Sequence, residues 1–81
     1  MSYIATFYTH FGAMSFRKKM KSMGDDKAEM MPGPRALSSS CGTCVRFFME
    51  VEPAAVAEED MERIVREEEN GSFTVLYENE M

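Results

Sequence analysis

The sequence predicts a small α+β domain, with one antiparallel sheet and two helices packed on one face of it. Short segments rich in aromatic and β-branched residues alternate with longer segments in which apolar residues recur at helical spacing. The hydrophobic fraction of 44% and the charged fraction of 28% are typical of a folded chain and not of a disordered one. Because 81 residues suffice for one small core, we expect residues 1–81 to form a single domain.

The first half of the chain is expected to form a strand, a helix and a second strand. Residues 2–8, SYIATFY, have the aromatic and β-branched composition of a strand, and their apolar groups fall on both faces, as in a central strand. The helix follows, with Thr9 as its N-cap and Gly24 as its end. Residues 27–31 form a short strand that is ended by Pro32. The apolar stripe of the helix consists of Ala13, Phe16, Met20 and Met23.

The second half is expected to contain two more strands with a helix between them. Residues 43–51 alternate as a strand does, and residues 72–78 form the last strand. Between them we expect a helix over residues 53–69, which begins at Pro53 and is followed by Gly71 as a stop signal. The apolar stripe of this helix consists of Ala57, Met61, Ile64 and Val65.

The expected element order is therefore β-α-β-β-α-β. A chain of this length with that order most simply forms a ferredoxin-like sandwich, a four-stranded antiparallel sheet with two helices on one face. The first and third strands are then central. The helix-free face of the sheet carries Cys44, Arg46 and Phe48, which share one face of the third strand. An exposed Phe48 there favours a homodimer or another partner contact.

Charge is distributed unevenly along the chain, whose net charge is −5. Residues 10–46 carry seven Lys/Arg and three acidic residues, whereas residues 47–81 carry two arginines and eleven acidic residues. The acidic half repels nucleic acid, and the basic half lacks the interleaved aromatic residues of a nucleic-acid reader. We therefore expect solvated helix faces and no nucleic acid as a partner. On the second helix this solvated face consists of Glu58, Glu59, Asp60 and Glu62.

The sequence also favours a particular compartment. No apolar run approaches the roughly 18 residues that a membrane span needs, and the N-terminus has no signal-peptide pattern. We therefore expect a cytoplasmic protein with no membrane partner. In the cytoplasm the two cysteines, Cys41 and Cys44, are more consistent with a reactive or ligating role than with a structural disulfide.

The segment between the second and third strands is long for a hairpin connection, and long loops in compact domains are often functional. Here the loop surrounds Cys41 with groups that stabilise an anion: serine hydroxyls, nearby arginines, and a glycine that lets amide N–H groups converge. The same features suit a thiolate, a persulfide or a small oxyanion such as phosphate, and a plain polar turn has the same composition. The candidate binding residues are Arg35, Ser38, Ser39, Ser40, Gly42 and Arg46.

Cys41 and Cys44, the candidate catalytic residues, have C-x-x-C spacing, which is compatible with several roles. A thioredoxin-type dithiol places its first cysteine at a helix N-terminus, whereas this motif leads into a strand. A zinc site needs about four ligands, which these cysteines and His10 do not provide, so we expect no metal. A third role is one working thiol with a neighbour, and a turn through Gly42 and Thr43 would bring the two Cα atoms within disulfide range. Cys44 is equally compatible with an inert position in the strand.

These motifs together resemble one known family. ATFYTH at 5–10, PGPR at 32–35, SSSCG at 38–42 and the strand residue Arg46 are similar to the signature of the selenium/sulfur carrier-like proteins. The resemblance extends from Tyr3 to about Tyr77. It implies that Cys41 holds sulfur or selenium as a persulfide or selenopersulfide. Cys44 departs from the family pattern, and the C-P-x-P motif of better-known sulfur carriers is absent.

Three hypotheses about function follow. The first is a carrier that receives sulfur or selenium on Cys41 from a donor protein and passes it to an acceptor protein. The second is a redox protein that uses Cys41 and Cys44 as a dithiol, and the third is a ferredoxin-like module for protein interaction or anion binding without thiol chemistry. The chain has no set of residues placed to act as a general base, as a self-sufficient hydrolase or transferase requires. We therefore expect a carrier more than a stand-alone enzyme, and no cofactor.

Overall fold

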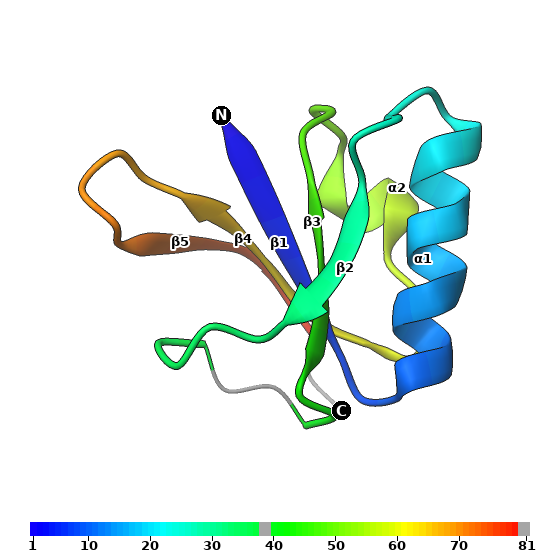
Figure 1. The fold of residues 1–81 in the computed structure, drawn as a ribbon, viewed down its shortest axis with the longest axis horizontal. Coiled ribbons are helices and arrows are strands. Elements are labelled where there is room, and N and C mark those ends of the chain that lie inside the picture. The colour runs from blue at the N-terminus through cyan, green and yellow to red at the C-terminus, as the bar shows by residue number, and fades with distance from the viewer. Residues whose placement is uncertain (38–39, 80–81) are drawn as a thin grey trace.

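The computed structural model describes residues 1–37 and 40–79. They form five strands and two helices (Figure 1). In chain order these are β1 (Ser2–Phe7), α1 (His10–Ser22), β2 (Glu29–Pro32), β3 (Thr43–Phe47), α2 (Pro53–Val56), β4 (Met61–Glu67) and β5 (Phe73–Glu78).

The strands form one antiparallel sheet with the order β2-β3-β1-β4-β5. The expected α+β class, with an antiparallel sheet and two helices, is confirmed. The expected number of four strands is wrong, because residues 61–67 of the expected second helix form the additional strand β4, which lies between β1 and the expected last strand, β5. The expected four-stranded ferredoxin-like sandwich is therefore not confirmed. β1 and β3 each pair with a neighbour on both sides, so the segment that contains Cys44 lies inside the sheet.

The second helix is much shorter than expected. α2 is a single turn of four residues, and most of the expected helix 53–69 instead forms β4. The helical spacing of Met61 and Ile64 has another cause: a register shift between Thr6 and Phe7 of β1 leaves Glu62 as an extra residue in β4. Residues an odd number apart fall on opposite faces of a regular strand, but this bulge places Met61 and Ile64 in the same core cluster. The bulge therefore gives Met61 and Ile64 of a strand the spacing that is expected of a helix.

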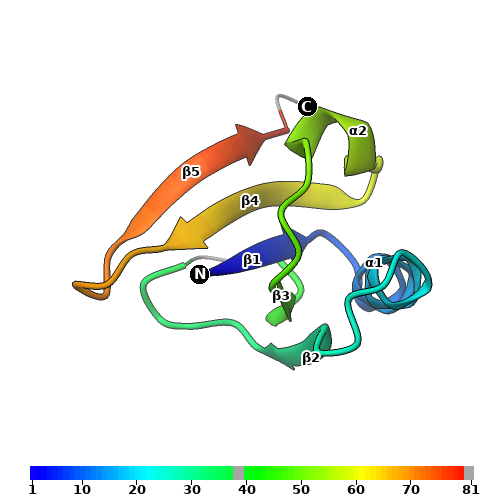
Figure 2. The same cartoon turned by 90° about the horizontal axis from the view of Figure 1, so that it is seen from above.

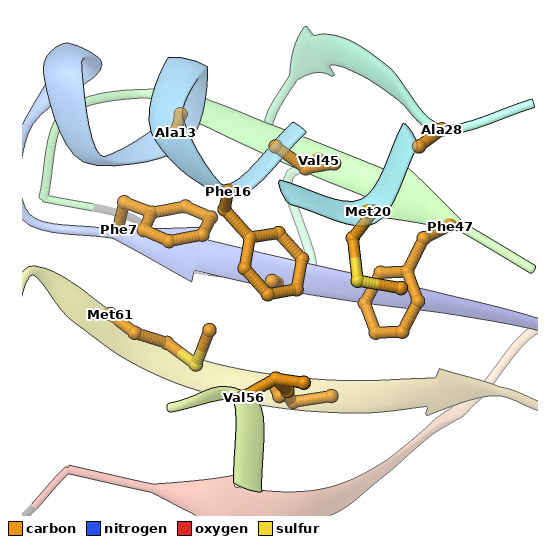
Figure 3. Packing of buried hydrophobic residues seen from close by; sticks show 11 residues of the cluster. Phe7, Ala13, Phe16, Met20, Ala28, Val45, Phe47, Val56 and Met61 are labelled. Carbon is orange, nitrogen blue, oxygen red and sulfur yellow. The ribbon is translucent and has the colours of Figure 1, made fainter. Parts of the chain in front are cut away.

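The larger core cluster lies between α1 and the sheet (Figure 3). Thr9 caps α1 as expected, because its hydroxyl accepts a hydrogen bond from the Gly12 N–H at 2.9 Å. Phe16 of α1 lies between Phe7 and Phe47 of the sheet, with ring centroids 5.4 Å from each. Met23, expected in the stripe of α1, is exposed because the helix ends at Ser22. α2 adds Val56 to the same cluster.

The opposite face of the sheet has no helix, and the β2–β3 loop crosses it (Figure 2). Leu37 of this loop is buried in a second, smaller cluster with Ile4, Cys44 and Val65 of three neighbouring strands. Phe48, expected on this face, follows the end of β3 and lines a surface hollow together with Arg17 and Lys21 of α1, with 41% of its surface exposed. Cys44 and Arg46 do lie on the helix-free side.

The first turn of α1 lies very close to the turn that precedes β4. The Tyr8 N–H donates to the Asp60 carbonyl oxygen at 2.8 Å, and the Thr9 hydroxyl donates to the Asp60 carboxylate at 3.2 Å. A Cβ atom at Gly12 would be 2.7 Å from the Cβ of Asp60. This contact joins α1, the end of β1 and the start of β4 at one end of the sheet.

Neither helix in the described part of the chain has the length and hydrophobicity of a membrane-spanning helix.

Candidate functional site

The C-x-x-C segment lies at the end of the sheet where β1 ends and where β3 and β4 begin (Figure 1). The loop is closed at its base by a hydrogen bond of 3.0 Å from the Gly33 N–H to the Gly42 carbonyl oxygen. Gly42 has a φ angle of 73°, a backbone conformation that side chains disfavour. The glycine therefore provides the turn that leads from Cys41 into β3, as its place in the motif predicted.

Cys41 is a free thiol at the end of this loop. Its side chain is half-buried and packs against the edge of the larger core cluster. The sulfur donates a hydrogen bond to the Thr43 carbonyl oxygen at 3.4 Å.

Ser40, which precedes Cys41, contacts a carboxylate and not the sulfur. Its backbone N–H donates to Oε1 of Glu62 and its hydroxyl donates to Oε2, both at 3.2 Å. The Glu62 side chain is only 15% exposed, so the two hydrogen bonds satisfy a carboxylate that has limited access to water. Ser38 and Ser39, the other predicted binding serines, lie outside the described residues.

Cys44 is buried on the helix-free face of β3, opposite Thr6 of β1 and Met31 of β2. Burial raises the pKa of the Cys44 thiol to about 11, with smaller contributions from the nearby Cys41 and Glu62. The thiol therefore stays protonated at neutral pH. A buried, protonated thiol is a poor nucleophile, so the two cysteines of the motif differ sharply in what they can do.

The two predicted arginines are placed differently. Arg35 is exposed in the outer turn of the loop. Arg46 is directed toward Glu67, with Nε 2.9 Å from Oε1 and a second hydrogen bond from Nη2 to Oε2 at 3.2 Å. The structure therefore brings Cys41, Ser40, Gly42 and Cys44 together, and commits the Arg46 guanidinium to a carboxylate at the other end of β4.

The model of a family described as "Putative Se/S carrier protein-like" matches residues 2–72. The chain belongs to this family. The match includes the whole cysteine loop and β1 to β4, and ends before β5. No curated protein and no solved structure matches the chain.

For this member of the Se/S carrier-like family, sequence analysis missed one residue of the site. Glu62 was assigned to a solvated helix face with three other acidic residues, but it lies on β4 with its carboxylate against Ser40. The signal that could have identified it is the alternative assignment of MERIVRE, residues 61–67, as a strand in which Ile64 and Val65 face the two sides of the sheet.

The described residues of this family member contain no group of three or more His, Cys, Asp or Glu side chains placed to hold a metal ion. The groups that the site does offer are centred on a thiol. They are the half-buried thiol of Cys41 at the end of the loop, the Glu62 carboxylate that holds the preceding residue, and the second thiol of Cys44, buried below the loop.

Proposed function

We propose that the protein carries a sulfur or selenium atom on the thiol of Cys41, as a persulfide or selenopersulfide, and transfers it to an acceptor protein. The observation that carries this proposal is the contrast between the two cysteines. Cys41 is half-buried at the end of a loop, whereas Cys44 is fully buried and its pKa is raised to about 11. Cys41 is thus the less buried of the two thiols, and it lies within the part of the chain that matches the carrier family.

In the loading step the Cys41 thiol loses its proton, and the thiolate attacks the outer sulfur of a donor persulfide, R–S–SH. A bond forms between Sγ of Cys41 and that sulfur, the S–S bond of the donor breaks, and the donor leaves as a thiolate that takes up the proton. The products are Cys41–S–SH and R–SH, with no net oxidation or reduction. A donor R–S–SeH reacts in the same way and leaves selenium on Cys41.

Within this proposal the loop stabilises the charge on the transferred atom. Ser38, Ser39 and the exposed Arg35 are the proposed donors, together with amide N–H groups of the loop. Arg46 is not among the proposed donors, because its guanidinium pairs with Glu67. Donor and acceptor proteins are the proposed partners, and a homodimer remains a prediction.

The dithiol redox hypothesis has less support. It needs Cys44 to attack an oxidised Cys41, and the raised pKa of the buried Cys44 leaves almost no thiolate at neutral pH. The two hypotheses differ in one result. A carrier keeps its sulfur uptake when Cys44 is replaced by Ser, whereas a dithiol protein loses its activity when either cysteine is replaced.

The test is to incubate the reduced protein with glutathione persulfide and to measure its mass. We expect an adduct of one sulfur atom, located on Cys41 by peptide mapping, in the wild type and in Cys44→Ser but not in Cys41→Ser. Transfer of the added sulfur atom from the isolated adduct to a small thiol would demonstrate the second step, delivery to an acceptor. No adduct on Cys41, or an adduct that needs Cys44, would contradict the proposal.

A further inference from the structure

We infer that Glu62 is a positioning residue for Cys41, because its carboxylate holds the cysteine-bearing end of the β2–β3 loop against β4. The contact between Ser40 and Glu62 joins residues that are 22 positions apart in the chain. That this contact governs access of a sulfur donor rests on the proposed function. The positioning itself does not, and it can be measured separately.

The β-bulge in β4 explains why Glu62 reaches the loop. Thr6 of β1 pairs with Arg63, and Phe7 pairs with Met61, so Glu62 is the extra residue between them. A bulge of this kind turns a side chain away from its regular direction, and bulges occur often beside functional sites. In a regular strand the side chains of Glu62 and Arg63 would point to opposite faces, whereas here Oε2 of Glu62 lies 3.9 Å from Nη2 of Arg63.

The base of the contact is held in the sheet. The Glu62 carbonyl oxygen accepts a hydrogen bond from the Asn79 N–H at 2.9 Å, just beyond the end of β5. The carboxylate therefore projects from a backbone that is fixed on the side opposite β1. From this base it accepts two hydrogen bonds from one residue, a backbone N–H and a hydroxyl of Ser40. Two bonds to one residue fix both its backbone and its side-chain direction.

The position of Ser40 in turn determines the position of Cys41. With Ser40 held at β4 and Gly42 in its turn, the Cys41 sulfur lies half-buried and donates to the Thr43 carbonyl oxygen. Reagents reach a half-buried thiol mainly when its segment opens, so the alkylation rate reports the population of the open loop. Loss of the Glu62 carboxylate removes both hydrogen bonds and should raise that population.

The experiment measures the rate at which iodoacetamide alkylates Cys41 in the full-length protein, followed by peptide mass spectrometry. In Glu62→Ala we expect a rate about fivefold above that of the wild type, the change expected for the loss of a typical hydrogen-bonded contact. Glu62→Gln, whose amide oxygen can still accept one of the two hydrogen bonds, should give a rate between the two. The matched control is Glu59→Ala, which removes an exposed carboxylate three positions earlier and should leave the rate unchanged.

A double-mutant cycle separates positioning from a general loss of stability. Ser40→Ala removes the hydroxyl hydrogen bond and keeps the backbone one, so alone it should raise the alkylation rate less than Glu62→Ala does. In the Glu62→Ala background it should add nothing, because the bond that it removes is already lost. Ser40 is exposed, so this variant keeps the test valid if Glu62→Ala does not fold. Independent effects of the two substitutions, or equal effects of Glu62→Ala and Glu59→Ala, would overturn the inference.

Glutathione persulfide distinguishes the failure of this inference from the failure of the proposed function. If Cys41 takes up sulfur but its alkylation is unaffected by Glu62→Ala, the carrier function stands and the positioning role is wrong. If alkylation responds as expected but no variant takes up sulfur on Cys41, Glu62 positions the loop and the carrier function is wrong. If both hold, the rate of sulfur uptake should rise together with the alkylation rate.

Discussion

Arg46 of β3 and Glu67 of β4 form a two-point ion pair across β1, which lies between their strands. Nε and Nη2 of Arg46 lie 2.9 Å and 3.2 Å from the two carboxylate oxygens. The Ser2 hydroxyl of β1 donates to the same carboxylate at 2.7 Å. Burial alone would raise the pKa of Glu67, but the hydrogen bonds from Ser2 and Arg46 and the charge of Arg46 outweigh it and lower the pKa overall.

Arg46→Gln should therefore lower the free energy of unfolding at neutral pH by about 1 kcal/mol, the size typical of a partly exposed ion pair. The lowered pKa of Glu67 makes this contribution fully present above the ordinary glutamate pKa of about 4.3, and it is lost as the pH falls through the lowered value. The free energies of unfolding of the wild type and the variant, measured with urea at a series of pH values, should thus converge in acid. Arg17→Gln on the exposed side of α1 is the control, and a constant difference at all pH values would contradict the assignment.

Cys44 should make the protein less stable in alkali. Its pKa in the folded protein is raised to about 11 from 9.0. The contribution of Cys44 to the free energy of unfolding is therefore present below about pH 9 and is lost as the pH rises toward 11. Over this range the wild type should lose about 2 kcal/mol more than Cys44→Ala, which starts from a lower stability because a buried sulfur is removed. Parallel stability curves for the two proteins would show that Cys44 does not titrate as described.

Asp25 should be among the residues most important for stability outside the core. Its buried carboxylate accepts hydrogen bonds from the Phe48 and Met49 N–H groups at 2.7 Å and 2.8 Å, and from the Lys27 N–H at 3.2 Å. Asp25→Ala leaves these amides without their charged acceptor and should cost about 2 to 3 kcal/mol. Asp26→Ala, at an exposed neighbour, should cost less than about 0.5 kcal/mol. Equal midpoints of thermal unfolding for the two variants would contradict this prediction.

Leu37 should hold the middle of the cysteine loop on the sheet. It is 8% exposed and packs in the cluster of Ile4, Cys44 and Val65 on the helix-free face. Leu37→Ala should lower the free energy of unfolding by about 2 kcal/mol and make Cys44 easier to alkylate. Leu76→Ala is the control, because Leu76 of β5 is already 36% exposed. A loop that does not depend on Leu37 would give the same result for both variants.

Much of the first half of the chain could be predicted from sequence, because local signals and tertiary structure agree there. The strand composition of β1, the Thr9 cap and the buried positions Ala13, Phe16 and Met20 of α1 all follow from residue type and spacing. The long connection between β2 and β3 was also placed correctly. What its length did not reveal is that Leu37 inside it contributes to the core.

In the second half the start of β3, the helix start at Pro53 and the last strand were predicted, but β4 was not, because its decisive feature depends on pairing with a distant strand. The bulge at Glu62 exists only where β4 meets β1, and it produces an apolar spacing that fits a helix as well as a strand. The error also hid part of the site, since a residue on a helix face would not contact Ser40. Cys41 and Cys44 were identified by the motif, but their different burial depends on the sheet.

The close approach at Gly12 limits how this end of the molecule can vary. A larger residue there would place its Cβ 2.7 Å from that of Asp60 and would force α1 away from the turn before β4. Since Glu62 follows Asp60 by two positions, a displacement of this turn would also move the carboxylate that meets Ser40. A substitution on α1 would thus reach the Cys41 thiol through the backbone of β4, and the distance between α1 and the turn before β4 at Gly12 would influence where Ser40 and Cys41 lie.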